Sequence, residues 1–188
     1  MKFAPDARSV IPVSIVTPDT LAETLDSLSP AARSWAKLND FKASSGSVIA
    51  LPNAQGEIEH ALIGLGTDEA QNSGRFFVAN GASRLPSGTY AIAGGVEGPA
   101  LEEAALGWLL ENYVFDKYKS LPKAKAHLVA PNGIDQHKIE AIAEGEFLTR
   151  DLINTSSEQM GPDELEDAAR SLATRHGASI NIVTGDAL

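Results

Sequence analysis

The sequence lacks cysteine, long apolar runs and a leader-like amino terminus. None of its 188 residues is cysteine, which excludes disulfide bonds, Cys-ligated zinc, iron–sulfur clusters and a thiol nucleophile. No stretch approaches the roughly 18 consecutive apolar residues of a membrane-spanning helix. No apolar run follows Lys2, as a secretory signal would require. We therefore expect a soluble, cytoplasmic protein with no membrane partner.

Basic residues are also scarce. Lysine and arginine total 15 against 25 aspartates and glutamates, which gives a formal charge of −10 with neutral histidines. Binding a phosphate backbone requires a concentrated basic face. The nearest approach is a group of four lysines interleaved with Tyr118 and Leu121, which we interpret as a solvated loop: Lys117, Lys119, Lys123 and Lys125. The composition therefore disfavours nucleic acid as a partner.

The residues that are present are typical of a globular α/β protein, since 43% are apolar and 21% are charged. Short β-branched segments alternate with segments of helical periodicity. Strands are predicted at 9–17, 48–51, 57–65, 90–93, 127–130 and 179–184, and helices at 30–40, 68–80, 99–115, 136–154 and 162–176. Pro12 predicts that the first strand lies near a sheet edge or at a bulge. The predicted class is α/β, a mixed central sheet with helices on both faces.

The usual catalytic and metal-binding patterns are absent. The four histidines form no HExxH or HxxEH pattern, and none has a second histidine within one helical turn: His60, His127, His137 and His176. Ser34 and Lys37 match S-x-x-K, but the partner motifs of that enzyme class are missing. Four acids at the start of the last predicted helix are interpreted as a solvated first turn: Asp163, Glu164, Glu166 and Asp167. We therefore predict no catalytic, cofactor-binding or metal-binding residue in this chain.

Two glycine-rich turns remain as candidates for anion binding. The Gly-Leu-Gly turn at 64–66 follows a predicted strand, but Glu69 stands where a dinucleotide-binding loop has its third glycine. The turn at 94–98 contains three glycines ahead of a helix and is the better candidate. A tight turn is the favoured interpretation of both. The alternative for 94–98 is a pocket for a nucleotide or ADP-ribose.

Two segments resemble the amino-terminal domain of the leucyl (cytosol) aminopeptidase family. Residues 107–119, GWLLENYVFDKYK, are similar to that family's G-x-x-L-x-x-Y-x-F-x-x-Y-K helix end. Residues 150–162 are similar to its R-D-L-V-N-T-P-x-N-x-M-x-P passage, although Ser156 replaces the usual Pro and Glu158 the usual Asn. Two shorter segments, 63–66 and 184–186, also resemble this family and occur in the same order and at the same spacing.

The resemblance implies a division into three parts. It implies a macro-domain-like α/β domain at 1–134, a connecting helix and loop at 135–160, and the start of a catalytic domain at 161–188. In the family, two divalent metals, Mn or Zn, activate a water in the catalytic domain to cut the first peptide bond. The residues that hold those metals lie downstream of the second motif, so none is carried over to this chain.

The resemblance thus implies the non-catalytic domain of a metal-dependent hydrolase, a protease of the aminopeptidase class, with a structural and assembly role. The isolated chain is expected to be inactive. Its expected partners are the catalytic domain of the same polypeptide and, in a homo-oligomer, further copies. The predicted helix at 162–176 carries an apolar stripe from Leu165 to Ala173, and we expect this stripe to be buried against another part of the protein. The alternative function is a macro-like module that binds a nucleotide or ADP-ribose.

Overall fold

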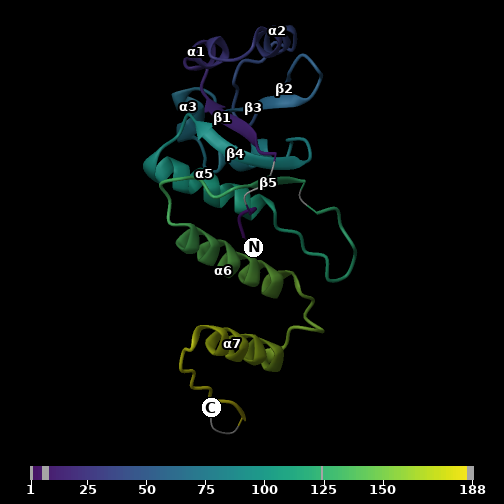
Figure 1. Ribbon diagram of the computed structural model, residues 1–188. Helices are drawn as coiled ribbons and strands as arrows, with labels where there is room; N and C mark the ends of the chain where they lie inside the picture. Colours follow the sequence, from purple (N-terminus) through teal and green to yellow (C-terminus); the bar gives the residue numbers. More distant parts are fainter. Residues whose placement is uncertain (1, 6–8, 124, 186–188) are drawn as a thin grey trace.

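A five-stranded mixed sheet forms the centre of the computed structural model, which describes residues 2–5, 9–123 and 125–185. The strands stand in the order β2-β3-β1-β4-β5 (Figure 1): β1 (Ile11–Val16), β2 (Val48–Pro52), β3 (Ile58–Gly64), β4 (Gly88–Gly94) and β5 (Ala126–Leu128). β2 runs antiparallel to β3, and the other neighbouring pairs are parallel. The predicted mixed sheet is confirmed.

Helices cover both faces of this sheet, as predicted. They are α1 (Leu21–Asp26), α2 (Pro30–Leu38), α3 (Asp68–Asn72), α4 (Phe77–Ala82), α5 (Gly98–Glu111), α6 (Gln136–Asn154) and α7 (Pro162–His176). Alternate residues of β3 face opposite ways. Leu62 packs in a cluster with residues of α1 and α2, whereas Ala61 and Ile63 pack in the larger cluster with α4, α5 and α6.

Local sequence explains where several helices begin and end. Ser29 accepts a hydrogen bond from the amide of Ala32 at the start of α2, and Asp135 caps α6 in the same way. Gly177, in the left-handed conformation, ends α7. The predicted helix at 99–115 ends earlier, at Glu111. The short helix α1 was not predicted, because six residues carry too little periodicity.

The predicted helix at 68–80 is wrong, because the chain breaks it into α3 and α4. Phe76, between them, has a φ of 59°, which is unusual for a residue with a side chain. Tight packing sets the direction of α4. A Cβ on Gly81 would lie 2.5 Å from Ile63 of β3, and one on Gly107 of α5 would lie 2.9 Å from Phe76. Contacts between elements therefore override the helical pattern.

Two strand predictions also need correction. β1 lies at the centre of the sheet, so the edge predicted from Pro12 is wrong, whereas the predicted bulge agrees with an irregularity in the pairing of β1 with β4. Pro12 is tolerated there because pairing with β3 starts at Val13, and the register with β4 shifts between Val13 and Ser14. The predicted final strand at 179–184 forms no strand in the described chain, and Ile180 and Val183 stay about half exposed.

The amino-terminal residues attach to the opposite edge of the molecule from α2. Ala4 forms a single parallel bridge to Val129, next to β5. The amide of Phe3 donates to the buried carboxylate of Glu140 on α6, 3.0 Å away. These contacts join the start of the chain to residues more than 120 positions later.

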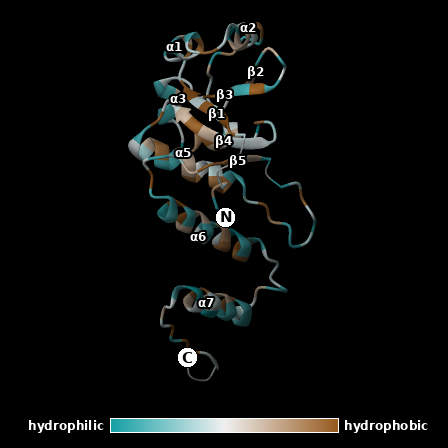
Figure 2. Cartoon of the chain, viewed as in Figure 1, coloured by the Kyte–Doolittle hydropathy of each residue, from teal (hydrophilic) through white to brown (hydrophobic). Residues whose placement is uncertain are grey.

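The last helix, α7, lies apart from the sheet at one end of the molecule (Figure 1). It is largely hydrophilic, in contrast to the apolar strands (Figure 2), and none of its residues is buried. Leu165 is 53% exposed and Leu172 39%. An ion pair of 2.6 Å joins its Arg175 to Glu144 of α6. Within the described residues, no helix combines the length and apolar character needed to cross a membrane.

Candidate functional site

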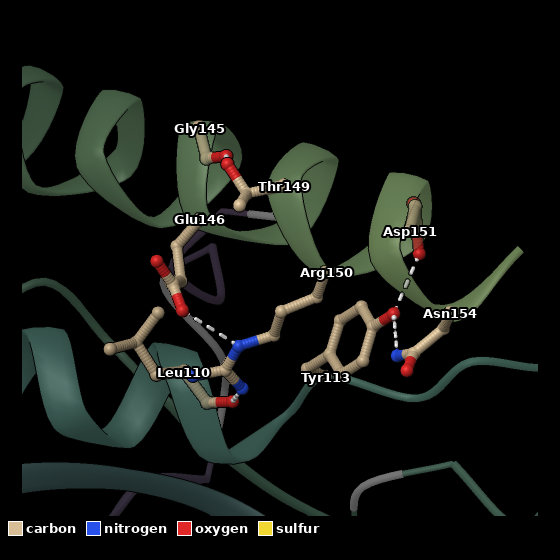
Figure 3. Close-up of polar contacts among 8 residues, drawn as sticks. All are labelled: Leu110, Tyr113, Gly145, Glu146, Thr149, Arg150, Asp151 and Asn154. Carbon is tan, nitrogen blue, oxygen red and sulfur yellow. Dashed lines mark hydrogen bonds and ion pairs between the residues drawn. The ribbon is translucent and has the colours of Figure 1, made fainter. Parts of the chain in front are cut away.

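The two motif segments meet where the end of α5 faces the end of α6 (Figure 3). Tyr113 follows α5, and its hydroxyl donates to Oδ1 of Asp151 at 2.8 Å. The same hydroxyl accepts from the side-chain amide of Asn154 at 3.1 Å. We call this contact between 110–118 and 146–159 the motif junction. It brings together side chains that are about 40 positions apart in the sequence.

Arg150 holds the end of α5 at the motif junction. Its guanidinium carbon lies 5.4 Å from the centre of the Tyr113 ring, and its Nε donates to Glu146 at 2.9 Å. A terminal nitrogen lies 3.5 Å from the carbonyl oxygen of Leu110. A cation near the last carbonyls of a helix interacts favourably with them. The ring of Phe147 packs against Tyr113 at 5.1 Å between centroids.

Tyr118 makes a second contact between the motifs. The amide of Ser156 donates to its hydroxyl at 2.8 Å, and the hydroxyl also lies 3.1 Å from Ser156 Oγ and 3.2 Å from Gln159 Oε1. Ser156 stands where the resembled motif has proline, which has no amide hydrogen to donate. The departure from the motif therefore adds a hydrogen bond at this position.

The two phenols at the junction differ in acidity. Burial, reinforced by the carboxylate of Asp151, raises the pKa of Tyr113. Hydrogen bonding with the side chain and the amide of Ser156 lowers the pKa of Tyr118. The hydrogen bonds of these two phenols join the segment after α5 to the end of α6 and the segment that follows it.

The histidines do not come together. His60, on β3, lies 2.9 Å from the hydroxyl of Ser14, and burial lowers its pKa. His127, His137 and His176 are exposed on three different elements. In the part of the chain that the structure describes, no three histidines, aspartates or glutamates are placed to hold a metal ion. That no residue of this chain is catalytic or binds a metal or cofactor stays a prediction.

The other candidate side chains have structural partners or face solvent. Ser34 and Lys37 both lie on the exposed face of α2. At the start of α7, Glu164 accepts from the amide of Gly161 at 2.9 Å, which closes the first turn. Glu166 pairs with Arg170 one turn later. Glu164 and Glu166 therefore stabilise α7, and Ser34 and Lys37 face solvent.

The glycine turns are shaped by close backbone packing. A Cβ on Gly95 would lie 1.6 Å from the carbonyl oxygen of Ile15, so only glycine fits beside β1. Gly66, with a φ of 78°, precedes α3, which has only five residues. A cavity of about 270 Å³ adjoins the 94–98 turn. Among the described residues that line it, the one charged group is Glu103, which is paired with Arg75 at 2.6 Å.

A second cavity, of about 300 Å³, adjoins the motif junction. It opens between the segment that follows α5, the segment that leads into β5, and α6. Its lining combines apolar, acidic and basic side chains: Asn112, Tyr113, Val114, Asp116, Lys123, His127, Phe147 and Asp151. Neither the spacing of these residues nor the motifs predicted that they would meet, because three separate segments contribute them.

Comparison with known proteins places this chain beside aminopeptidases. A profile of the family described as "M17 aminopeptidase, N-terminal domain" matches residues 11–131. A probable cytosol aminopeptidase of Sinorhizobium fredii is 32% identical over 161 residues, which cover 73% of this chain and 32% of that protein. The chain thus spans about a third of that relative's length.

Solved structures agree on the fold. The cytosol aminopeptidase of Coxiella burnetii superposes with a TM-score of 0.85 at 25% identity, over 97% of this chain and 39% of its own. The bottromycin maturation enzyme BotP, solved in complex with Mn, superposes with a TM-score of 0.69 at 24% identity, over 94% of this chain and 39% of its own.

Proposed function

Because the chain belongs to the M17 aminopeptidase family, we propose that it is the non-catalytic amino-terminal domain of a leucyl aminopeptidase, with a structural and assembly role. The observation that carries this proposal is the match of residues 11–131 to the family's N-terminal domain, in a chain that spans about a third of its relative's length. Family membership confirms the resemblance that the two motifs indicated.

We also propose a division of the chain into three parts, which the packing supports. Residues 1–134 contain the sheet and the helices α1 to α5. α6, within 135–160, adds Ile139 and Ala143 to the core cluster and contacts the segment after α5 through the motif junction. Residues 161–188 contain α7, which has no buried residue. We assign the last segment to the start of the catalytic domain. The likeness of the first part to macro domains is part of the same proposal.

The partner that we assign to α7 is the catalytic domain of the same polypeptide. Full burial of a leucine contributes about 1.5–3 kcal/mol, and Leu165 and Leu172 still expose a third to a half of their surface. Covering these two side chains would therefore stabilise the assembled enzyme. We also propose that the enzyme is a homo-oligomer, in which this chain has further copies as partners, and that it is cytoplasmic.

The metals of the parent enzyme, Mn or Zn, are assigned to the catalytic domain. BotP, a structural neighbour, was solved with Mn. Among the residues that the structure describes, no three acidic or imidazole side chains lie close enough together to bind a metal ion. We therefore assign no step of peptide hydrolysis to the residues of this chain. Its residues support and position the enzyme without touching the scissile bond.

A peptidase assay tests the proposal. The purified 188-residue chain is incubated with Leu-p-nitroanilide and Mn²⁺ or Zn²⁺, with the full-length S. fredii relative as a positive control. We expect release of nitroaniline only from the full-length enzyme. Metal-dependent turnover that follows the 188-residue chain through purification would overturn the proposal.

The alternative function is ADP-ribose or nucleotide binding at 94–98. The adjoining cavity lies near the carboxyl ends of the parallel strands, where α/β folds bind ligands. Its described lining offers the acidic Glu103 and no basic group, which opposes a phosphate. Calorimetric titration with ADP-ribose should therefore show no binding heat, and a saturable heat would favour the alternative.

A further inference from the structure

We propose that the cavity beside the motif junction binds a small zwitterion, an α-amino acid with an apolar side chain. Its volume of about 300 Å³ lies at the lower end of the range for small-molecule sites. A single amino acid fits this space and a dinucleotide does not. The inference goes beyond the proposed structural role, which requires no ligand in this chain.

The basic and the acidic side chains that line this cavity come from different elements. Lys123 and His127 both come from the segment that leads into and forms β5. The carboxylates come from elsewhere, Asp116 from the segment after α5 and Asp151 from α6. A ligand that carries both a carboxylate and an ammonium group can therefore meet a partner of opposite charge on each side.

Two polar side chains that line the cavity, Asp151 and Asn112, have hydrogen-bonding groups without a partner among the described residues. Oδ1 of Asp151 accepts a hydrogen bond from the Tyr113 hydroxyl, and no described residue donates a hydrogen bond to Oδ2. Asn112 is only 9% exposed, and its side-chain amide has no hydrogen-bond partner among the described residues. Since the described side chains leave no fully buried polar atom unpartnered, the amide of Asn112 keeps some accessible surface, and Asn112 is one of the residues that line this cavity. An amide can both donate and accept, which suits a zwitterion.

The remaining lining is apolar. Val114 and the rings of Tyr113 and Phe147 line the same cavity, and the two rings pack 5.1 Å apart. This surface suits an aliphatic side chain such as that of leucine. The cavity near 94–98 has an apolar lining too, but its single charged group is already paired with Arg75. The cavity at the junction, in contrast to the one near 94–98, combines both signs of charge with an apolar surface.

Calorimetry on the unmodified 188-residue chain tests the proposal directly. L-leucine is titrated to about 10 mM, where a site with a Kd of about 1 mM would be nine-tenths filled. Two analogues each lack one charge: 4-methylpentanoate has no ammonium group, and isopentylamine has no carboxylate. We expect leucine to bind at least about tenfold more tightly than either analogue. No binding heat from leucine, or equal binding of an analogue, would overturn the proposal.

Variants then locate the site. Lys123→Gln and Asp116→Asn each remove one charge at an exposed position, and each should weaken leucine binding at least about tenfold. Lys119→Gln, in the same segment but outside the cavity lining, is the matched control and should bind as the parent does. Circular dichroism checks that each variant is folded. Unchanged binding by Lys123→Gln would place the ligand elsewhere and overturn the assignment.

Discussion

The sheet and α7 show two different ways in which a sequence specifies structure. In the sheet, β1 and β3 are buried on both faces, and residues such as Val13 and Leu62 have no exposed surface. α7 is capped at both ends, yet it buries no residue. Local capping is therefore enough to define a helix, whereas its place in the fold depends on burial. The comparison predicts where substitutions matter.

The largest expected difference is between a core residue and its counterpart on α7. Trp108 is fully buried, packs 5.8 Å from Tyr90 and donates to the carbonyl oxygen of Ala126. Trp108→Ala should lower the free energy of unfolding by about 3–5 kcal/mol. Leu165→Ala, on α7, should change it by less than about 0.5 kcal/mol. Urea denaturation followed by circular dichroism measures both, and a large effect of Leu165→Ala would show that α7 is part of the core.

Glycines sharpen the same comparison. Gly95→Ala places a Cβ against the backbone of β1 and should cost about 3 kcal/mol, because backbone can move little to relieve the clash. Gly177 also has a positive φ, 63°, but open space surrounds it. Gly177→Ala should therefore cost about 1 kcal/mol or less. Equal losses from the two variants, measured by urea denaturation, would contradict the packing described for β1 and β4.

The motif junction lies between the sheet and α7, and substitutions there should lower the free energy of unfolding by an intermediate amount. Tyr113→Phe removes the hydroxyl that contacts Asp151 and Asn154, with an expected loss of about 1 kcal/mol. Amide hydrogen exchange should become faster at the end of α6. Tyr118→Phe is the matched variant, and its effect should fall on 155–159 instead. If Tyr113→Phe leaves exchange in α6 unchanged, the junction does not hold that helix.

The smallest expected effect is a pH dependence from the sheet. Burial lowers the pKa of His60 in the folded chain, so the unfolded chain binds a proton more readily. Stability from this group is therefore complete above the usual histidine pKa of about 6.5 and is lost as the pH falls through that value toward the folded pKa. The urea midpoint should decrease below pH 6.5, and His60→Gln should reduce that decrease. An identical pH profile in the variant would exclude His60 as its source.

The sequence predicts the parts of this fold that depend on local patterns. The ends of α2 and α7 and the strands β2 and β3 all follow from short stretches of residues. The motif resemblance identifies the family, although it does not show that Tyr113 and Asp151 touch. Those contacts depend on how α5 and α6 pack, and no spacing within either segment specifies it.

The predictions that were wrong also depend on how distant segments pack. The break at Phe76 results from the packing of α4 against β3 and α5, through Gly81 and Gly107. The apolar stretch at 179–184 has strand-forming residues but no neighbouring strand in the described chain with which to pair. The central position of β1 could not be predicted from Pro12, because its tolerance depends on where pairing with β3 begins. In each case the deciding information lies in a distant segment.

The bond between the amide of Phe3 and the carboxylate of Glu140 has a practical consequence. Because Phe3 is buried against α6 and Ala4 forms a bridge beside β5, a label attached to the exposed side chain of Lys2 would lie next to α6. A fluorophore placed there would therefore report on the movement of that helix.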